Sequence, residues 1–135
     1  MREADPLAKP AQLALLFASA EYAEHFGDMV QRVQQATGAE VVAGCSGQSI
    51  IGPEREIEDE PAVSLMKLSL PGAALRAVHI GQQELAAAED PAAWHRLTGV
   101  APAEVNAWLV FADPFRLDCE TLIGQLEMAY PDAPI

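Results

Sequence analysis

The chain has 135 residues, half of them hydrophobic and 21% charged, which is enough material for one independently folded domain. Twenty acidic residues against eight basic ones give a net charge of −12, which argues against binding to nucleic acid or to an anionic membrane surface. No apolar run approaches the ~20 residues that span a bilayer, the N-terminus lacks a signal-peptide pattern, and two cysteines are too few for a disulfide scaffold. We therefore expect an acidic, cytoplasmic protein.

A βαβ unit is predicted over about residues 12–44, after a disordered N-terminal tail at 1–11. Residues 13–17 (LALLF) form a continuous apolar run, typical of a strand that is buried on both faces. Ser19 then takes the N-cap position of a helix with an amphipathic stripe, and Gly38 is placed to end that helix. A second short apolar strand follows and closes on a glycine-rich turn, GCSG, at 44–47. This order and spacing are those of a right-handed βαβ unit.

The middle of the chain has the pattern of a β-hairpin. Residues 62–70 alternate in part between apolar and polar, Pro71-Gly72 marks a turn, and residues 75–80 alternate again. We expect the two alternating segments to pair antiparallel. The acid-rich stretch at 54–60, just before them, is expected to be a solvated loop or a charged strand edge that deters pairing.

Two further helices are predicted from their caps. Asp90 and Pro91 form a good N-cap and first-residue pair for a short helix that Gly99 stops. Asp118 can cap a helix whose apolar face ends at Tyr130. Both helices are expected to bury their apolar stripes against the sheet.

The last third of the chain resembles the first in its order of elements. Residues 108–111 (WLVF) match the first apolar strand, the helix after Asp118 matches the first helix, and the chain stops at the opening of a closing strand. We therefore predict a second βαβ-like unit over about 106–135 that is cut short, with a natural domain that continues beyond it. An unfinished sheet edge of this kind invites pairing with a second copy of the chain. The predicted fold class is α/β: a mixed β-sheet with helices packed on it, and two βαβ-like units that flank a central hairpin.

Two long segments of the chain resemble the N-terminal FIST domain, named for F-box and intracellular signal transduction proteins. They are GAEVVAGCSGQSIIGPEREIEDEPAVSLMKLSLPG and FADPFRLDCETLIGQLEMAYPDAPI, and the likeness runs from about Gln12 to Ile135. The resemblance implies a sensory domain of bacterial signalling that binds small ligands such as amino acids. It also implies a C-terminal FIST domain as a partner. It carries no established ligand-contacting residues onto this chain.

A candidate ligand site follows from the predicted strand ends. In open α/β sheets, ligands bind beyond the carboxyl ends of parallel strands. Three such ends carry small or polar residues: Ser19, Gly44, Cys45, Ser46, Gly47 and Asp113. The glycines would let backbone N–H groups approach a carboxylate, the helix start at Ser19 favours an anion, and Asp113 would hold an ammonium group. We therefore predict an amino acid or a small carboxylate as the ligand.

Simpler interpretations of the same residues stay open. Ser19 serves as an N-cap alone, GCSG as a short turn alone, and Cys45 as a small residue at a strand end. A cysteine-dependent hydrolase would need a base beside Cys45 to form the thiolate. The spacing pairs none of the three histidines with it; they are His25, His79 and His95. We therefore predict no catalytic residue.

The competing function is a protein-interaction module without a small ligand. It would use the hairpin or the acidic stretch at 54–60 to contact a signalling protein or a second FIST domain. No CxxC, HxxxH or HExxH spacing occurs, and no phosphate-binding loop or dinucleotide fingerprint. Neither a metal nor a cofactor is expected.

Overall fold

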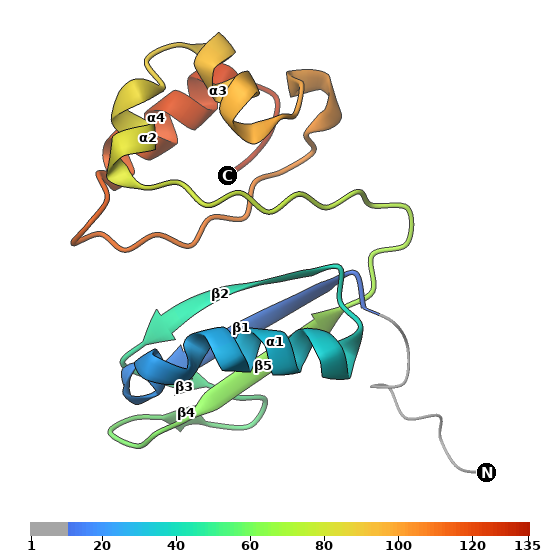
Figure 1. Ribbon diagram of the computed structural model, residues 1–135, viewed down its shortest axis with the longest axis vertical. Coiled ribbons are helices and arrows are strands. Elements are labelled where there is room, and N and C mark those ends of the chain that lie inside the picture. Colours follow the sequence, from blue (N-terminus) through green and yellow to red (C-terminus); the bar gives the residue numbers. More distant parts are fainter. Residues whose placement is uncertain (1–10) are drawn as a thin grey trace. The chain divides into compact units, whose positions relative to one another are not determined.

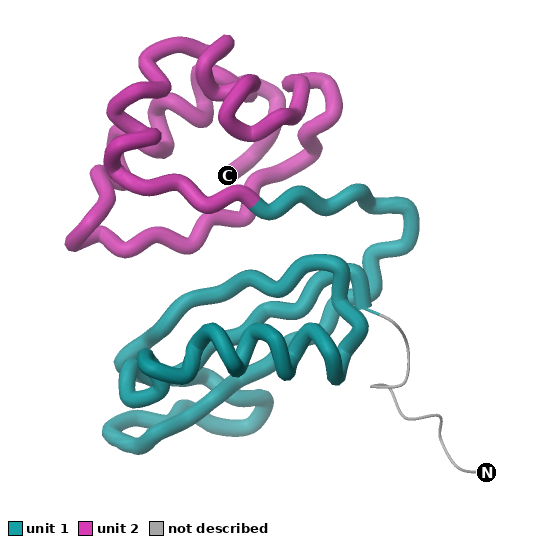
Figure 2. The backbone as a smooth tube through the Cα atoms, viewed as in Figure 1, with its two compact units in different colours: residues 1–77 teal, residues 78–135 magenta. Residues whose placement is uncertain are grey.

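The computed structural model describes residues 11–135, so nearly all of the predicted N-terminal tail lies outside the described residues. The chain divides into two compact units, a first unit that ends at Ala77 and a second unit over Val78–Ile135 (Figure 2). Each unit has its own set of elements and is described by itself.

The first unit is built on the predicted βαβ unit. Strand β1 (Leu13–Ser19) leads through the short 3-10 helix η2 (Ala20–His25) into helix α1 (Phe26–Thr37), and strand β2 (Val41–Gly47) then runs parallel to β1. Helix α1 ends at Gly38, which has a left-handed φ of 65°. Glycine adopts that conformation without steric cost, so the predicted helix end is confirmed. The glycine-rich residues 44–47 belong to β2 itself, so the turn expected there is wrong.

Strand β5 (Val63–Leu68) completes a mixed three-stranded sheet in the order β2-β1-β5 (Figure 1). It pairs antiparallel with β1, from Leu13 opposite Leu68 to Ala18 opposite Val63. The predicted partner of this strand, residues 75–80, contains no strand, so the central hairpin is wrong in its second half. Alternation identifies an extended segment but not its neighbour, and the free edge of β1 accepts β5 instead. A smaller hairpin of β3 (Ile50–Ile51) and β4 (Glu56–Ile57) includes part of the acid-rich stretch.

Helix α1 packs on one face of this sheet, where it contacts β1 and β2 (Figure 1). The β1 side chains of that face are small or apolar and are buried: Ala14, Leu16 and Ala18. Alanines at two of these three positions let the helix lie close to the strand. Burial of this stripe supplies the hydrophobic stabilisation of the first unit.

The second unit is helical. Its elements are α2 (Gln82–Ala87), α3 (Pro91–Thr98), the 3-10 helix η3 (Pro102–Glu104) and α4 (Cys119–Ala129). The predicted caps are confirmed: the Asp90 and Asp118 carboxylates accept hydrogen bonds from the backbone N–H groups of Ala93 and Thr121, at 2.7 and 3.0 Å, and Gly99 ends α3 at φ 68°. The core joins these helices around five large or medium side chains, which are Leu85, Trp94, Leu122, Leu126 and Tyr130.

The second βαβ-like unit is not formed, because the described residues of the second unit contain no strand. Residues 108–111 run along the core as an extended segment, with Trp108 and Val110 half-buried against it and Leu109 exposed. One backbone hydrogen bond, from the Trp108 N–H to the Pro134 carbonyl at 2.8 Å, joins it to the chain end that was expected to pair near it. The Trp108 ring instead packs edge-on against Tyr130, with ring centroids 5.0 Å apart. The α/β class with a mixed sheet is therefore confirmed, and its strands all lie in the first unit.

Candidate ligand-binding site

A cleft of about 210 Å³ lies beside the C-terminal ends of β1 and β2, under the first half of α1. Three elements line it, and none of the lining residues is charged. They are Leu16 and Ala18 of β1, Phe26 and Val30 of α1, and Val42, Ala43, Gly44, Cys45 and Ser46 of β2. Three of the six predicted site residues, Gly44, Cys45 and Ser46, thus line this cleft.

The strand register decides which side chains point into the cleft. Leu16 lies opposite Gly44 and Ala18 opposite Ser46, so these four residues share the face of the sheet that α1 covers. Side chains alternate along a strand, so the Cys45 side chain points to the other face and this residue lines the cleft with its backbone. Ser46 therefore provides the one hydroxyl group among the lining residues.

Gly44 allows the two strands to meet at the floor of the cleft. A Cβ atom on this residue would lie 1.8 Å from the Leu16 carbonyl oxygen, and its φ of 151° is one that side-chain-bearing residues rarely adopt. The glycine is therefore required by the close approach of β1 and β2. The sequence predicted that Gly44 lets backbone N–H groups approach a ligand. In the structure, the close approach at Gly44 is to Leu16 of β1.

Ser19 is buried, with 2% of its surface exposed, and its hydroxyl group is used inside the first unit. It accepts a hydrogen bond from the Ala62 N–H at 2.8 Å and donates one to the Ala62 carbonyl at 3.3 Å. Ser19 takes the predicted N-cap position of η2, but its side chain makes no capping hydrogen bond. The hydroxyl thus ties the end of β1 to the chain before β5.

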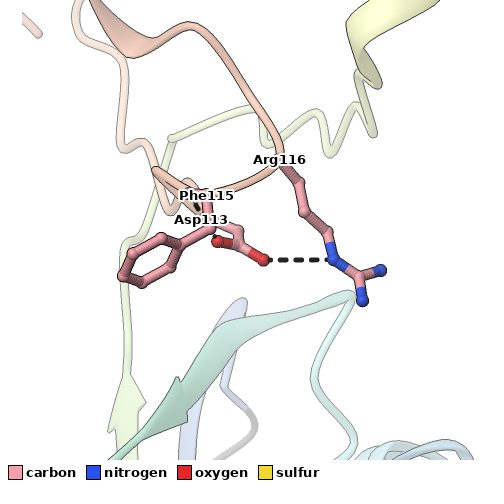
Figure 3. Close-up of polar contacts among 3 residues, drawn as sticks. All are labelled: Asp113, Phe115 and Arg116. Carbon is pink, nitrogen blue, oxygen red and sulfur yellow. Dashed lines mark hydrogen bonds and ion pairs between the residues drawn. The ribbon is translucent and has the colours of Figure 1, made fainter.

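Gly47 and Asp113 are the remaining predicted site residues. Gly47 lies opposite Ser19 at the last pair of the β1–β2 ladder. Asp113 belongs to the second unit, where one carboxylate oxygen accepts the Phe115 N–H at 2.9 Å and the other lies 3.6 Å from the Arg116 Nε (Figure 3). The predicted contact of Asp113 with a ligand ammonium group stays a prediction.

Sequence reasoning missed Phe26 and Val30 as site residues. It assigned them to the apolar stripe of the first helix, which is where they lie. Their position in the sequence could have indicated the cleft, because both residues lie in the first turns of the helix that follows the carboxyl end of β1. Val30 retains 38% of its surface exposed although it faces the sheet, which is consistent with a cleft at that point.

The described residues offer no metal centre and no nucleophile–base pair. Within residues 11–135, no group of three or more His, Cys, Asp and Glu side chains is arranged to hold a metal ion. The Cys45 thiol makes no hydrogen bond to a histidine in that same range, and both cysteines are free. The site is thus a small apolar cleft with one hydroxyl group.

Comparison with known proteins identifies the family. Over the part of the chain that the structure describes, no helix is long and apolar enough to cross a membrane. Neither the curated proteins nor the solved structures give a significant match. The model of the FIST N domain matches residues 12–135, nearly the whole chain. The chain therefore belongs to the FIST family, whose N domain implies a sensory role in signal transduction.

Proposed function

We propose that this FIST N domain senses a small molecule that binds in the cleft between α1 and the C-terminal ends of β1 and β2. The cleft itself supports the proposal: it lies where α/β sheets bind their ligands, and three elements of one unit line it. Residues Gly44, Cys45 and Ser46 of the predicted site are part of that lining. Amino acids and small carboxylates, predicted from the sequence, belong in the first panel of compounds.

Binding in the cleft would give the domain a way to signal. Helix α1 covers the cleft through Phe26 and Val30. It is the one α-helix in the described part of the first unit, since η2 is a short 3-10 helix. A ligand held between α1 and the sheet would add contacts to both and would hold the helix more firmly in place. A signalling protein that binds the outer face of α1 would respond to that change.

The test is thermal unfolding of the chain with a panel of amino acids, carboxylates, amides and alcohols. A compound at 100 times its dissociation constant adds ~2.7 kcal/mol, which raises the melting temperature by several degrees in a domain of this size. The substitution Val30→Trp fills the cleft from a partly exposed helix position, so it should abolish the shift. The matched control, Gln31→Trp, places the same side chain at the next and exposed position of α1 and should keep it.

Two outcomes would contradict the proposal. A cooperative transition that no compound of the panel moves would favour the interaction module over the sensor. An equal shift in both tryptophan variants would show that the ligand binds outside the cleft. The substitution Asp113→Ala tests the predicted ammonium contact separately, since this carboxylate is exposed and its partners are Phe115 and Arg116.

A further inference from the structure

The lining of the cleft carries no charge, although 21% of the chain is charged. Its side chains are aliphatic or aromatic apart from the Cys45 thiol and the Ser46 hydroxyl, and the thiol points to the other face of the sheet. The lining contains no Asp or Glu that would pair with a ligand ammonium group, and no Lys or Arg that would pair with a ligand carboxylate.

The free energy of desolvation then selects among small ligands. A charged group that leaves water for an apolar cleft loses its hydration, and only a paired charge or several hydrogen bonds offset that loss. A zwitterionic amino acid would lose hydration at two charges, an anion or a cation at one. The chain's net charge of −12 adds a repulsive potential against anions. An uncharged molecule avoids both costs.

The size of the cleft limits the ligand as well. A closed apolar cavity of about 150 Å³ accepts benzene, so about 210 Å³ corresponds to a molecule of roughly eight non-hydrogen atoms. Such a molecule has room for a short hydrocarbon body against Leu16, Phe26 and Val30. One polar group can remain near the Ser46 hydroxyl.

We infer that the cleft selects an uncharged small molecule with a branched or cyclic hydrocarbon body and one hydrogen-bonding group, and that it discriminates against zwitterionic amino acids. The inference rests on the proposed function, since it names the ligand class of the same cleft. It differs from the amino acid or carboxylate that the strand ends alone predicted.

The experiment titrates the isotope-labelled chain with four compounds that share one branched skeleton and differ in charge. The probes are 4-methylpentanamide, 4-methylpentanoate, 4-methylpentylamine and leucine, followed by the methyl resonances of Val30 and Val42, which line the cleft. Val105, which packs against the core of the second unit, serves as the internal control. We expect the amide to bind at least tenfold more tightly than each charged probe, and to shift the two cleft valines but not Val105.

The other outcomes contradict either the uncharged ligand class or the sensor proposal. If leucine, the carboxylate or the amine shifts the cleft valines at a lower concentration than the amide, the uncharged class is wrong and the sensor proposal stands. If no probe moves the resonances of the cleft valines or of Val105, the cleft does not bind compounds of this size and the sensor proposal fails with it. A Val30→Trp chain that still binds the amide would place the site elsewhere and overturn both.

Discussion

The substitution Gly44→Ala should separate β1 from β2 and destabilise the first unit. The added Cβ atom would lie 1.8 Å from the Leu16 carbonyl oxygen, whereas real contacts of this kind stay beyond 3.0 Å. The obstacle is backbone on the central strand of the sheet, so no flexible side chain can move aside. The two strands must therefore shift apart by about 1.2 Å at this pair, a distance that follows from the same contact.

The cost can be worked out from that shift. The N···O distance of a backbone hydrogen bond is about 2.9 Å, and the bond is lost beyond about 3.5 Å. A displacement of this size therefore breaks the two ladder bonds that flank the pair. At about 1 kcal/mol for each bond, with about 1 kcal/mol more for an alanine at a φ of 151°, the free energy of unfolding falls by about 3 kcal/mol. Whole domains are stable by only ~5–15 kcal/mol, so the loss is readily measured.

Hydrogen exchange of the β1 amides and urea unfolding followed by circular dichroism measure this loss. The control is Gly27→Ala in α1, where an added Cβ atom meets nothing within 4 Å and alanine suits the helix. We expect the β1 amides to lose about two orders of magnitude in protection in Gly44→Ala and to keep it in Gly27→Ala. A Gly44→Ala chain as stable as its control would refute the close-approach argument.

Three further substitutions test individual hydrogen bonds. Ser19→Ala leaves the buried Ala62 N–H without its partner, so unfolding by urea should show a loss of about 1–3 kcal/mol, while ligand affinity in the cleft stays unchanged. The Tyr130 hydroxyl hydrogen-bonds with the Thr98 hydroxyl and the Val100 carbonyl in the second unit, so Tyr130→Phe should cost about 1 kcal/mol in the same assay, with the ring packing retained. Hydrogen bonds from Thr121 hold the pKa of Asp118 below its ordinary value of 3.8, so this cap stabilises α4 above that pH and its contribution is lost as the pH falls through the lowered pKa. Asp118→Ala should therefore speed amide exchange in α4 at neutral pH, by a factor that shrinks toward 1 in strong acid; a constant factor would contradict this.

Local signals predicted the fold better than non-local ones. Gly38, Gly99 and the two capping aspartates fix helix ends through their own backbone or a neighbour three residues on, and all four predictions are confirmed. The pairing of residues 62–70 with residues 75–80 and the strand at 108–111 were wrong because pairing depends on a partner that alternation and apolar runs do not identify.

The candidate site was predicted in part for the same reason. The rule that ligands bind at the carboxyl ends of parallel strands located Gly44 and Ser46 beside the cleft, because β1 and β2 do pair in parallel. It could not show that the Ser19 hydroxyl is used by Ala62, a residue 43 positions away. Nor could it assign Phe26 and Val30 to the cleft, since the apolar stripe of a helix has the same sequence pattern whether its side chains pack tightly on the sheet or leave a cleft.

The central place of β1 has a consequence for how the protein is made. Its first pairing partners, opposite Leu13, are Val41 and Leu68, which are synthesised 28 and 55 residues later. At ~5–20 residues per second, an uncharged seven-residue strand, LALLFAS, therefore waits seconds beside the ribosome before either neighbour exists. Such a segment is the kind that pairs with other nascent chains, so expression yield should rise with chaperones that shield it and fall when synthesis of the following residues is slow. The central strand of the finished sheet is thus also a segment that needs protection from aggregation during synthesis.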